Sequence, residues 1–311
     1  MGNSVAIPAS SVGLIEAAVN KGQAKDGVEK APKEIRSAGL DQLIRTLNAK
    51  VTEYGEVKQP ESREPDIVAN CKNQKALINA TLELTELVEK SVTENDITLI
   101  IGGDHSSGIG AIEGHCKAFP DSFVVWVDAH ADINTPDSSV SKNTHGMPVS
   151  FVIKDTYKQI PHTLGFEKIR PVLDPNQIIY IGLRDLDPPE LITLKEFNIP
   201  YFNMADVRQL GIEKVVETTL RIIEKTKPHC KIHLSFDIDS LDPKFAPSTG
   251  TPVPDGLTLE EGKYICRVLA QTGQLRSMLM VEVNTALGSE EDAKVTLHSA
   301  NEILKSALLL D

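Results

Sequence analysis

The chain of 311 residues has 32 basic and 44 acidic side chains, a formal net charge of −12, and 41% hydrophobic residues. This composition excludes disordered, collagen-like and disulfide-rich chains, because it supplies enough apolar surface for a large core. The acidic balance argues against a nucleic-acid partner, which requires clustered Lys and Arg, and no apolar run is long enough for a membrane span.

The cysteines are scattered and lack a Cys-x-x-Cys spacing, which indicates reduced thiols. The N-terminal sequence has no basic stretch followed by an apolar one, so it is a poor signal peptide. We therefore expect a cytoplasmic protein.

Short apolar runs alternate along the chain with segments of helical periodicity. An N-terminal strand is expected around Leu14–Ala18, and further strands are predicted at Ile97–Ile101, Phe123–Val127, Gln177–Ile181, Lys231–Phe236 and Ser277–Val283. Helices are predicted at Asn73–Thr93, Ser107–Ala118, Pro189–Phe197, Gly211–Lys225, Thr258–Thr272 and Ser289–Leu309. This alternation is typical of a parallel sheet covered on both sides. Because we find no repeat or linker, residues 1–311 are expected to form one α/β domain.

Acidic residues and histidines follow four of these strands directly. In chain order they are Asp104 and His105, then Asp128, His130 and Asp132, then Asp237 and Asp239, and finally Glu282. Because the carboxyl ends of parallel strands meet at one edge of a sheet, we expect these groups to converge there.

The spacing of these residues predicts a metal site. In extended backbone, Asp128, His130 and Asp132 would share one face, as would Asp237 and Asp239. Four clustered carboxylates raise one another's pKa unless cations neutralise them, and two divalent ions balance four negative charges. Carboxylate and imidazole ligands, with His105 as the sixth, suit Mn²⁺, and two such ions can bridge a water and convert it to hydroxide.

Four other interpretations of these residues are open. A single Asp-x-His-x-Asp is usually a solvated loop, but three such clusters after buried strands are hard to attribute to chance. Nucleotide binding is rejected, because Gly108-x-Gly110-xxx-Gly114 misses the required spacing by one residue. A binuclear metallophosphoesterase also mixes Asp and His, but no Arg or Lys lies near the motifs to hold phosphate. A non-catalytic protein is disfavoured by the complete ligand set.

From Lys21-Gly22-Gln23 to the final helix, the chain resembles the ureohydrolase family. The motifs that carry the resemblance are Gly102-Gly103-Asp104-His105-Ser106, Asp128-Ala129-His130-Ala131-Asp132, Ser235-Phe236-Asp237-Ile238-Asp239 and Gly250-Thr251-Pro252. The resemblance implies a three-layer α/β/α sandwich with a mostly parallel sheet of about eight strands and two Mn²⁺ per subunit. It assigns one ion to His105, Asp128, Asp132 and Asp237, and the other to Asp128, His130, Asp237 and Asp239.

Within that family, the substrate-binding segments resemble those of arginases. The resemblance implies that Asn134 and Ser141 bind the α-carboxylate of L-arginine, and that Asp187 and Glu190 bind its α-ammonium group. Taken alone, the first pair would be ordinary turn residues and the second an acidic helix start. The implied products are L-ornithine and urea. The alternative is an agmatinase or another guanidino-acid amidinohydrolase.

The expected mechanism is attack of a metal-bridging hydroxide on the guanidinium carbon. Glu282 would pair with the guanidinium, Asp132 would pass a proton to the leaving amine, and His145 would act as acid, base or proton shuttle. Thr251 would lie near the guanidinium. A homo-oligomer, a trimer or a hexamer, is implied, although Glu260 stands where many arginases have an arginine that pairs across subunits. Glu16, in the N-terminal strand, is expected to be buried and to disturb that region.

Overall fold

The structure is a computed structural model that describes residues 9–59, 67–68, 70–161 and 165–310. Eight parallel strands form one sheet in the order β2-β1-β5-β10-β9-β6-β7-β8. They are β1 (Ser11–Ala18), β2 (Lys50–Lys58), β5 (Ile97–Gly102), β6 (Ser122–Val127), β7 (Ile178–Leu183), β8 (Tyr201–Asn203), β9 (Lys231–Asp237) and β10 (Leu275–Val281). Separately, β3 (Ile67–Val68) and β4 (Cys71–Lys72) pair in antiparallel fashion.

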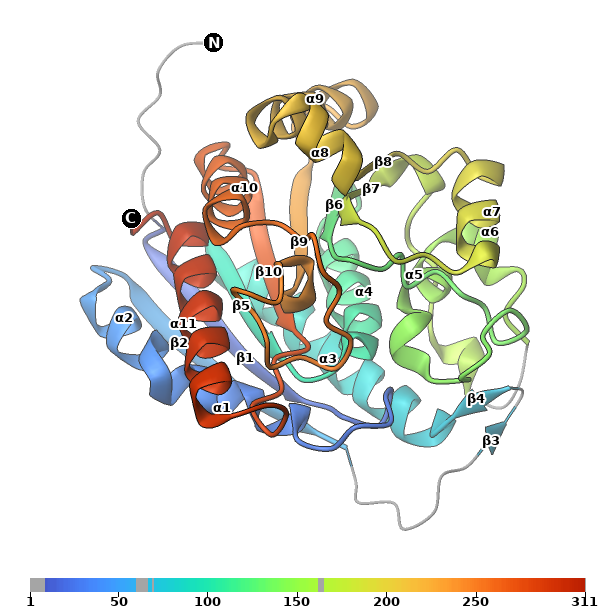
Figure 1. Cartoon of the computed structure of the whole chain (residues 1–311), viewed down its shortest axis with the longest axis horizontal. Helices are drawn as coiled ribbons and strands as arrows, with labels where there is room; N and C mark the ends of the chain where they lie inside the picture. The colour runs from blue at the N-terminus through green and yellow to red at the C-terminus, as the bar shows by residue number, and fades with distance from the viewer. Residues whose placement is uncertain (1–8, 60–66, 69, 162–164, 311) are drawn as a thin grey trace.

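Helices cover both faces of the sheet, which confirms the α/β/α sandwich (Figure 1). One face packs against α1 (Ala31–Ile35), α2 (Asp41–Thr46), α8 (Met204–Leu210), α9 (Ile212–Thr226), α10 (Leu259–Gln271) and α11 (Glu290–Ala307). The other face packs against α3 (Gln74–Glu94), α4 (Gly108–Ala118), α5 (Pro148–Val152), α6 (Lys154–Tyr157) and α7 (Pro188–Glu196). Successive strand residues alternate between the two cores, as Val125 and Trp126 do.

The predicted central strands and long helices agree with the structure to within about two residues at each end. The sequence pattern missed β2 and β8, the two edges of the sheet. In β2 only Val57 is buried, and β8 has three half-buried residues. Edge strands are often short and polar, so they lack the apolar runs that marked the others.

Glu16 in β1 is half-buried, and its charge is paired. Its Oε1 lies 2.6 Å from Nη1 of Arg36, whose guanidinium also binds Asp41 at 2.7 Å and Glu53 at 2.9 Å. The hydrogen bond with Glu53 is the largest influence on the pKa of Arg36, which is raised despite partial burial. The acidic residue in this strand is therefore accommodated by an ion-pair network.

Among the described residues, no helix is both long and apolar enough to cross a membrane. The four cysteines are buried thiols. Residues 1–8, which carry most of the expectation about a signal peptide, lie outside the described residues.

Candidate metal centre

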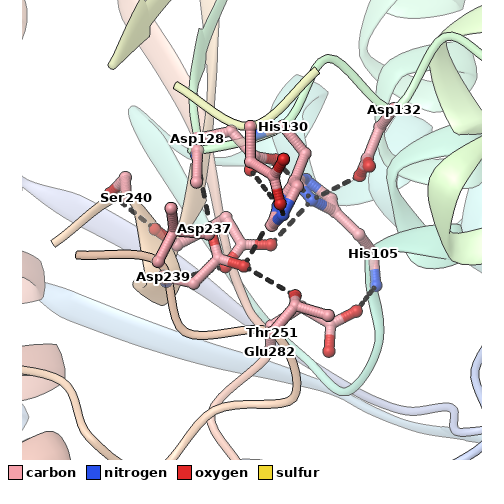
Figure 2. Close-up of polar contacts among 12 residues, drawn as sticks. His105, Asp128, His130, Asp132, Asp237, Asp239, Ser240, Thr251 and Glu282 are labelled. Carbon is pink, nitrogen blue, oxygen red and sulfur yellow. Dashed lines mark hydrogen bonds and ion pairs between the residues drawn. The ribbon is translucent and has the colours of Figure 1, made fainter. Parts of the chain in front are cut away.

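The carboxyl ends of the central strands meet at one edge of the sheet, where a cleft opens. All the predicted site residues except His105 and Asp128 line this cleft. His105 and Asp128 lie beneath it and are fully buried. The structure therefore brings together every residue that the sequence assigned to the site, and Figure 2 shows the core of this cluster.

The imidazole of His105 lies at the centre of three carboxylates. Its Nδ1 is 3.1 Å from Asp128, 3.1 Å from Asp132 and 3.0 Å from Asp237, measured to the nearest oxygen of each. One N–H can donate to one acceptor well, and none of the described residues gives this buried atom a hydrogen bond of good geometry. A nitrogen surrounded by three carboxylate oxygens is the donor set of a cation.

His130 forms a second, adjacent group. Its Nδ1 lies 3.4 Å from Oδ1 of Asp128 and 3.3 Å from Oδ2 of Asp239. Ligand atoms of His105, Asp128 and Asp132 lie within 4.8 Å of one another, as do those of Asp128, His130 and Asp239. Because Asp128 belongs to both groups, the geometry fits two ions that share a carboxylate.

The carboxylates perturb one another in the way that the charge argument predicts. Burial raises the pKa of Asp237, and the charges of Asp239 and Asp128 raise it further. Burial and the charge of Asp128 raise the pKa of Asp132 to about 6. Burial also acts on Asp128, but the neighbouring imidazoles of His105 and His130 favour its ionised form, outweigh the burial and lower the pKa. The four carboxylates of the site therefore carry more negative charge than its two imidazoles can neutralise.

The backbone that produces this convergence is not the extended one that we expected. β6 ends at Val127, and Asp132 has a left-handed backbone with φ of 50°. Asp239 lies in a 3₁₀ turn, Ile238–Ser240, just after β9. The side chains converge because the chain turns sharply at the strand ends. Left-handed backbone is uncommon for residues other than glycine and is concentrated at functional sites.

Glu282 is held next to the metal-site residues by one of its two oxygens. Its Oε1 accepts the backbone N–H of His105 at 2.9 Å and lies 3.2 Å from Nδ1 of His145. Its backbone is also left-handed, with φ of 63°, and its N–H donates to Gly103 at 2.8 Å. A Cβ on Gly103 would lie 1.9 Å from the carbonyl oxygen of Val19, so this strand end requires glycine.

His145 is anchored by its backbone as well as by its ring. Its N–H donates to the carbonyl of Gly22 at 3.0 Å, and the N–H of Gly22 donates to the buried carboxylate of Asp104 at 2.7 Å. Burial lowers the pKa of His145, but the hydrogen bond and charge of Glu282 outweigh it and raise the pKa to about 9.

The predicted substrate-binding residues form a polar rim. Nδ2 of Asn134 donates to Oδ2 of Asp187 at 2.9 Å. Asp187 and Glu190 form the capping box that begins α7, so this pair is also the acidic helix start that the sequence alone suggested. Glu190 is nevertheless buried, and burial together with the charge of Asp132 raises its pKa to about 8. Thr251 donates to Oδ2 of Asp239 at 3.0 Å (Figure 2).

Three residues around the histidines were missed by the sequence reasoning. Ser235 Oγ lies 2.8 Å from Nε2 of His105, whose ring stacks on Trp126 at 4.1 Å. The Trp126 indole also donates to Asp128 at 2.9 Å, and Asp185 lies 3.7 Å from Nε2 of His130. The position of Ser235, two residues before Asp237 on the same strand face, was the available signal. Such partners orient metal-binding histidines.

The chain matches known proteins along nearly its whole length. The model of the arginase family matches residues 10–310. The hepatic arginase of Aquarana catesbeiana is 44% identical over 95% of this chain and 92% of its own, and the mitochondrial arginase-2 of Homo sapiens is 43% identical over 96% and 84%. The crystal structure of Entamoeba histolytica arginase in complex with L-ornithine superposes with a TM-score of 0.87 at 30% identity, covering 97% of this chain and 99% of that one. The chain therefore belongs to the arginase family.

Proposed function

We propose that the protein hydrolyses the guanidinium group of L-arginine to give L-ornithine and urea. The observation that carries this proposal is the arrangement of one cleft. Four carboxylates and two histidines gather at its floor, and groups suited to an amino acid's carboxylate and ammonium gather at its rim. The matched relatives are named as arginases, which agrees with this arrangement.

We assign two Mn²⁺ ions to the floor of the cleft. The surplus of carboxylate over imidazole, the absence of thiolate and the three oxygens around Nδ1 of His105 support this assignment. The first ion would be held by His105, Asp128, Asp132 and Asp237, and the second by Asp128, His130, Asp237 and Asp239. When bound, the ions would supply hydroxide at neutral pH by lowering the pKa of water.

The chain's own residues orient the substrate and move protons. Glu282 uses Oε1 to hold His105 and His145, while its Oε2 lies on the side of Gly250 in the cleft. That second oxygen is placed to pair with the guanidinium. Asp132, whose carboxylate lines the cleft, would pass a proton to the leaving amine. His145 exchanges protons with solvent, because its side chain is 22% exposed. Thr251 donates to Asp239 and would hold that ligand in place beside the guanidinium.

The rim residues favour L-arginine over agmatine. Asn134 and Ser141 are assigned to the α-carboxylate, and Asp187 and Glu190 to the α-ammonium group. Agmatine has no carboxylate, so it would leave the first pair without a partner and forgo their hydrogen bonds.

Steady-state urea release from L-arginine and from agmatine, with Mn²⁺-loaded protein, tests this function. We expect kcat/KM for L-arginine to exceed that for agmatine by at least about 100-fold, the cost of leaving polar site groups unpaired. A preference for agmatine would replace the arginase proposal by agmatinase. No urea from either substrate would refute hydrolysis of guanidinium groups.

We further propose one domain, a homotrimer or hexamer, and a cytoplasmic location. Both hydrophobic cores are built on the same sheet, which supports one domain. The buried thiols suit a reducing compartment. On α10, Glu260 pairs with Lys263 at 3.4 Å and its side chain is 78% exposed, so an oligomer would use other contacts there. Sedimentation and cell fractionation test these points, and a monomer or a membrane fraction would contradict them.

A further inference from the structure

One wall of the cleft is the rim loop, residues 134–143, which carries both Asn134 and Ser141. The rim loop has no helix or strand, and Val140 near its tip is 93% exposed. A site that distinguishes substrates must hold its groups in place to within a fraction of an ångström. The rim loop therefore requires support from outside itself.

The side chain of Asn70, which lies 67 and 72 residues from its two partners, supplies that support. Its Nδ2 donates to Oδ1 of Asp137 at 3.1 Å, and its Oδ1 accepts from Nζ of Lys142 at 2.6 Å. We call Asn70, Asp137 and Lys142 the clamp. Because a carboxamide has both a donor and an acceptor, a single side chain bridges two positions in the rim loop.

Asp137 and Lys142, the partners of Asn70, are sequence neighbours of residues that form or support the proposed substrate contacts. Asp137 precedes Ser138, whose Oγ donates to Oδ1 of Asn134 at 2.8 Å. Lys142 follows Ser141, whose Oγ accepts the N–H of Asn143 at 3.3 Å. The clamp therefore acts on both proposed carboxylate-binding residues. It reaches Asn134 through Ser138, and it reaches Ser141 through the peptide bond to Lys142.

The backbone of Lys142 shows that the rim loop is held in an unfavourable conformation. Its φ is 62°, which a lysine adopts only where the surroundings fix it. Its carbonyl accepts the N–H of Lys72 in β4 at 3.0 Å, and Nζ of Lys72 donates to Asn143 at 3.1 Å. β4 and the clamp thus hold the same turn.

The segment around β4 is itself anchored. Cys71 is fully buried, and its sulfur lies 3.9 Å from that of Met147, just before α5. Nδ2 of Asn73 donates to the carbonyl of Lys21 at 2.8 Å. Figure 1 shows the β3–β4 pair at the periphery of the molecule, away from the central sheet. Because the contacts of Cys71 and Asn73 hold this segment in place, the segment can in turn hold the rim loop at the cleft.

We propose that Asn70 is a positioning residue that fixes the rim loop and thereby sets the preference for ligands with an α-carboxylate. This inference rests on the proposed function. The guanidinium end of the cleft is built from strand ends that Asn70 does not contact, so its loss should weaken recognition of the carboxylate alone.

The test compares Asn70→Leu, which removes both hydrogen bonds at similar volume, with Ile67→Thr, an exposed change in β3. In the Mn²⁺-loaded enzyme, L-ornithine and 1,4-diaminobutane, which differ by the carboxylate, serve as inhibitors of urea release from L-arginine. For Asn70→Leu we expect KM for L-arginine and the inhibition constant of L-ornithine to rise about tenfold, with kcat and the inhibition constant of 1,4-diaminobutane within about twofold. Ile67→Thr should match the native enzyme.

A rescue variant separates positioning from general damage. Asn70→Asp combined with Asp137→Asn exchanges the carboxamide and the carboxylate and keeps both hydrogen bonds, so the affinity for L-ornithine should return to within about threefold of native. Equal losses for both inhibitors in Asn70→Leu, or no loss for either, would overturn the proposal.

Amide hydrogen exchange gives a readout that does not depend on turnover. Residues 134–143 should exchange faster in Asn70→Leu than in the native protein and in Ile67→Thr. If the native protein releases no urea, the proposed function fails, and amide exchange alone then tests whether Asn70 holds the rim loop. Unchanged exchange of residues 134–143 in Asn70→Leu would refute that role.

Discussion

Oε1 of Glu282 accepts the backbone N–H of His105 at 2.9 Å and also lies 3.2 Å from Nδ1 of His145. A single carboxylate oxygen thus joins the backbone of a proposed metal ligand to the ring of the proposed proton shuttle. The two residues that Glu282 holds come from different parts of the chain, and the backbone N–H of Glu282, whose φ is left-handed, donates to Gly103. This relationship determines how the site responds to pH.

The metal-free protein should lose stability as the pH rises from about 6.5 to about 9. The pKa of His145 is about 9, against an ordinary value of 6.5. When the pKa of a histidine is higher in the folded than in the unfolded protein, its protonation stabilises the fold. This stabilisation is complete at a pH below the pKa of the unfolded protein, and it is lost as the pH rises through the pKa of the folded protein. The difference corresponds to at most about 3 kcal/mol. Denaturant unfolding at pH 6 and pH 9 measures it, and a pH dependence equally large in His145→Asn would contradict this origin.

His130→Ala should abolish most urea release and reduce the bound metal. The change removes the imidazole between Asp128 and Asp239 and leaves their charges less compensated, so both metal affinity and folding stability should fall. We expect kcat to fall at least about 100-fold, because the loss of a direct ligand should cost at least as much as the loss of a partner that orients one. Metal analysis and urea assays check this. His298→Ala, an exposed change on α11, is the control and should leave both quantities unchanged.

Asn134→Ala should mainly raise KM for L-arginine. Binding of the carboxylate is similar in the ground and transition states, so kcat should change little. The loss of the hydrogen bond to Asp187 also loosens the proposed ammonium site, so KM should rise by about tenfold or more. Steady-state kinetics measure both constants, with the exposed Asn48→Ala as control. A large fall in kcat at unchanged KM would contradict the assignment.

Arg36→Met should destabilise the fold by about 2 kcal/mol, because it leaves the half-buried carboxylate of Glu16 without its partner. Adding Glu16→Gln should restore part of the loss by removing the unpaired charge. Denaturant unfolding of the two variants and the native protein tests this coupling. A double variant that is less stable than Arg36→Met would refute it.

The central fold and the convergence of the site could be predicted because both depend on local patterns. Buried runs such as Phe123–Val127 mark strands without knowledge of their neighbours, and Asp128 follows such a run directly. β2 escaped prediction because its residues are mostly exposed or half-buried. The turn at Asp132 could not be read from spacing, since φ of 50° depends on contacts such as that of its carbonyl with Val149.

The surroundings of the site were harder to predict because they depend on which strands are neighbours. Ser235 on β9 reaches His105, which follows β5, although β10 lies between the two strands and 130 residues separate the partners in sequence. Asn70 lies outside every motif, and its role depends on the packing of a peripheral strand against the rim loop. The burial of Glu190 followed from tertiary packing, although its place in a capping box could be read from the sequence.

The most direct test of the account is the number of Mn²⁺ ions bound per chain when metal-free protein is titrated to saturation. Asp128 belongs to both ligand groups, and Asp237 lies 3.0 Å from Nδ1 of His105, so we predict two ions, with urea release from L-arginine appearing as the sites fill. Saturation at no ion or at one would contradict the binuclear centre on which the proposed chemistry depends.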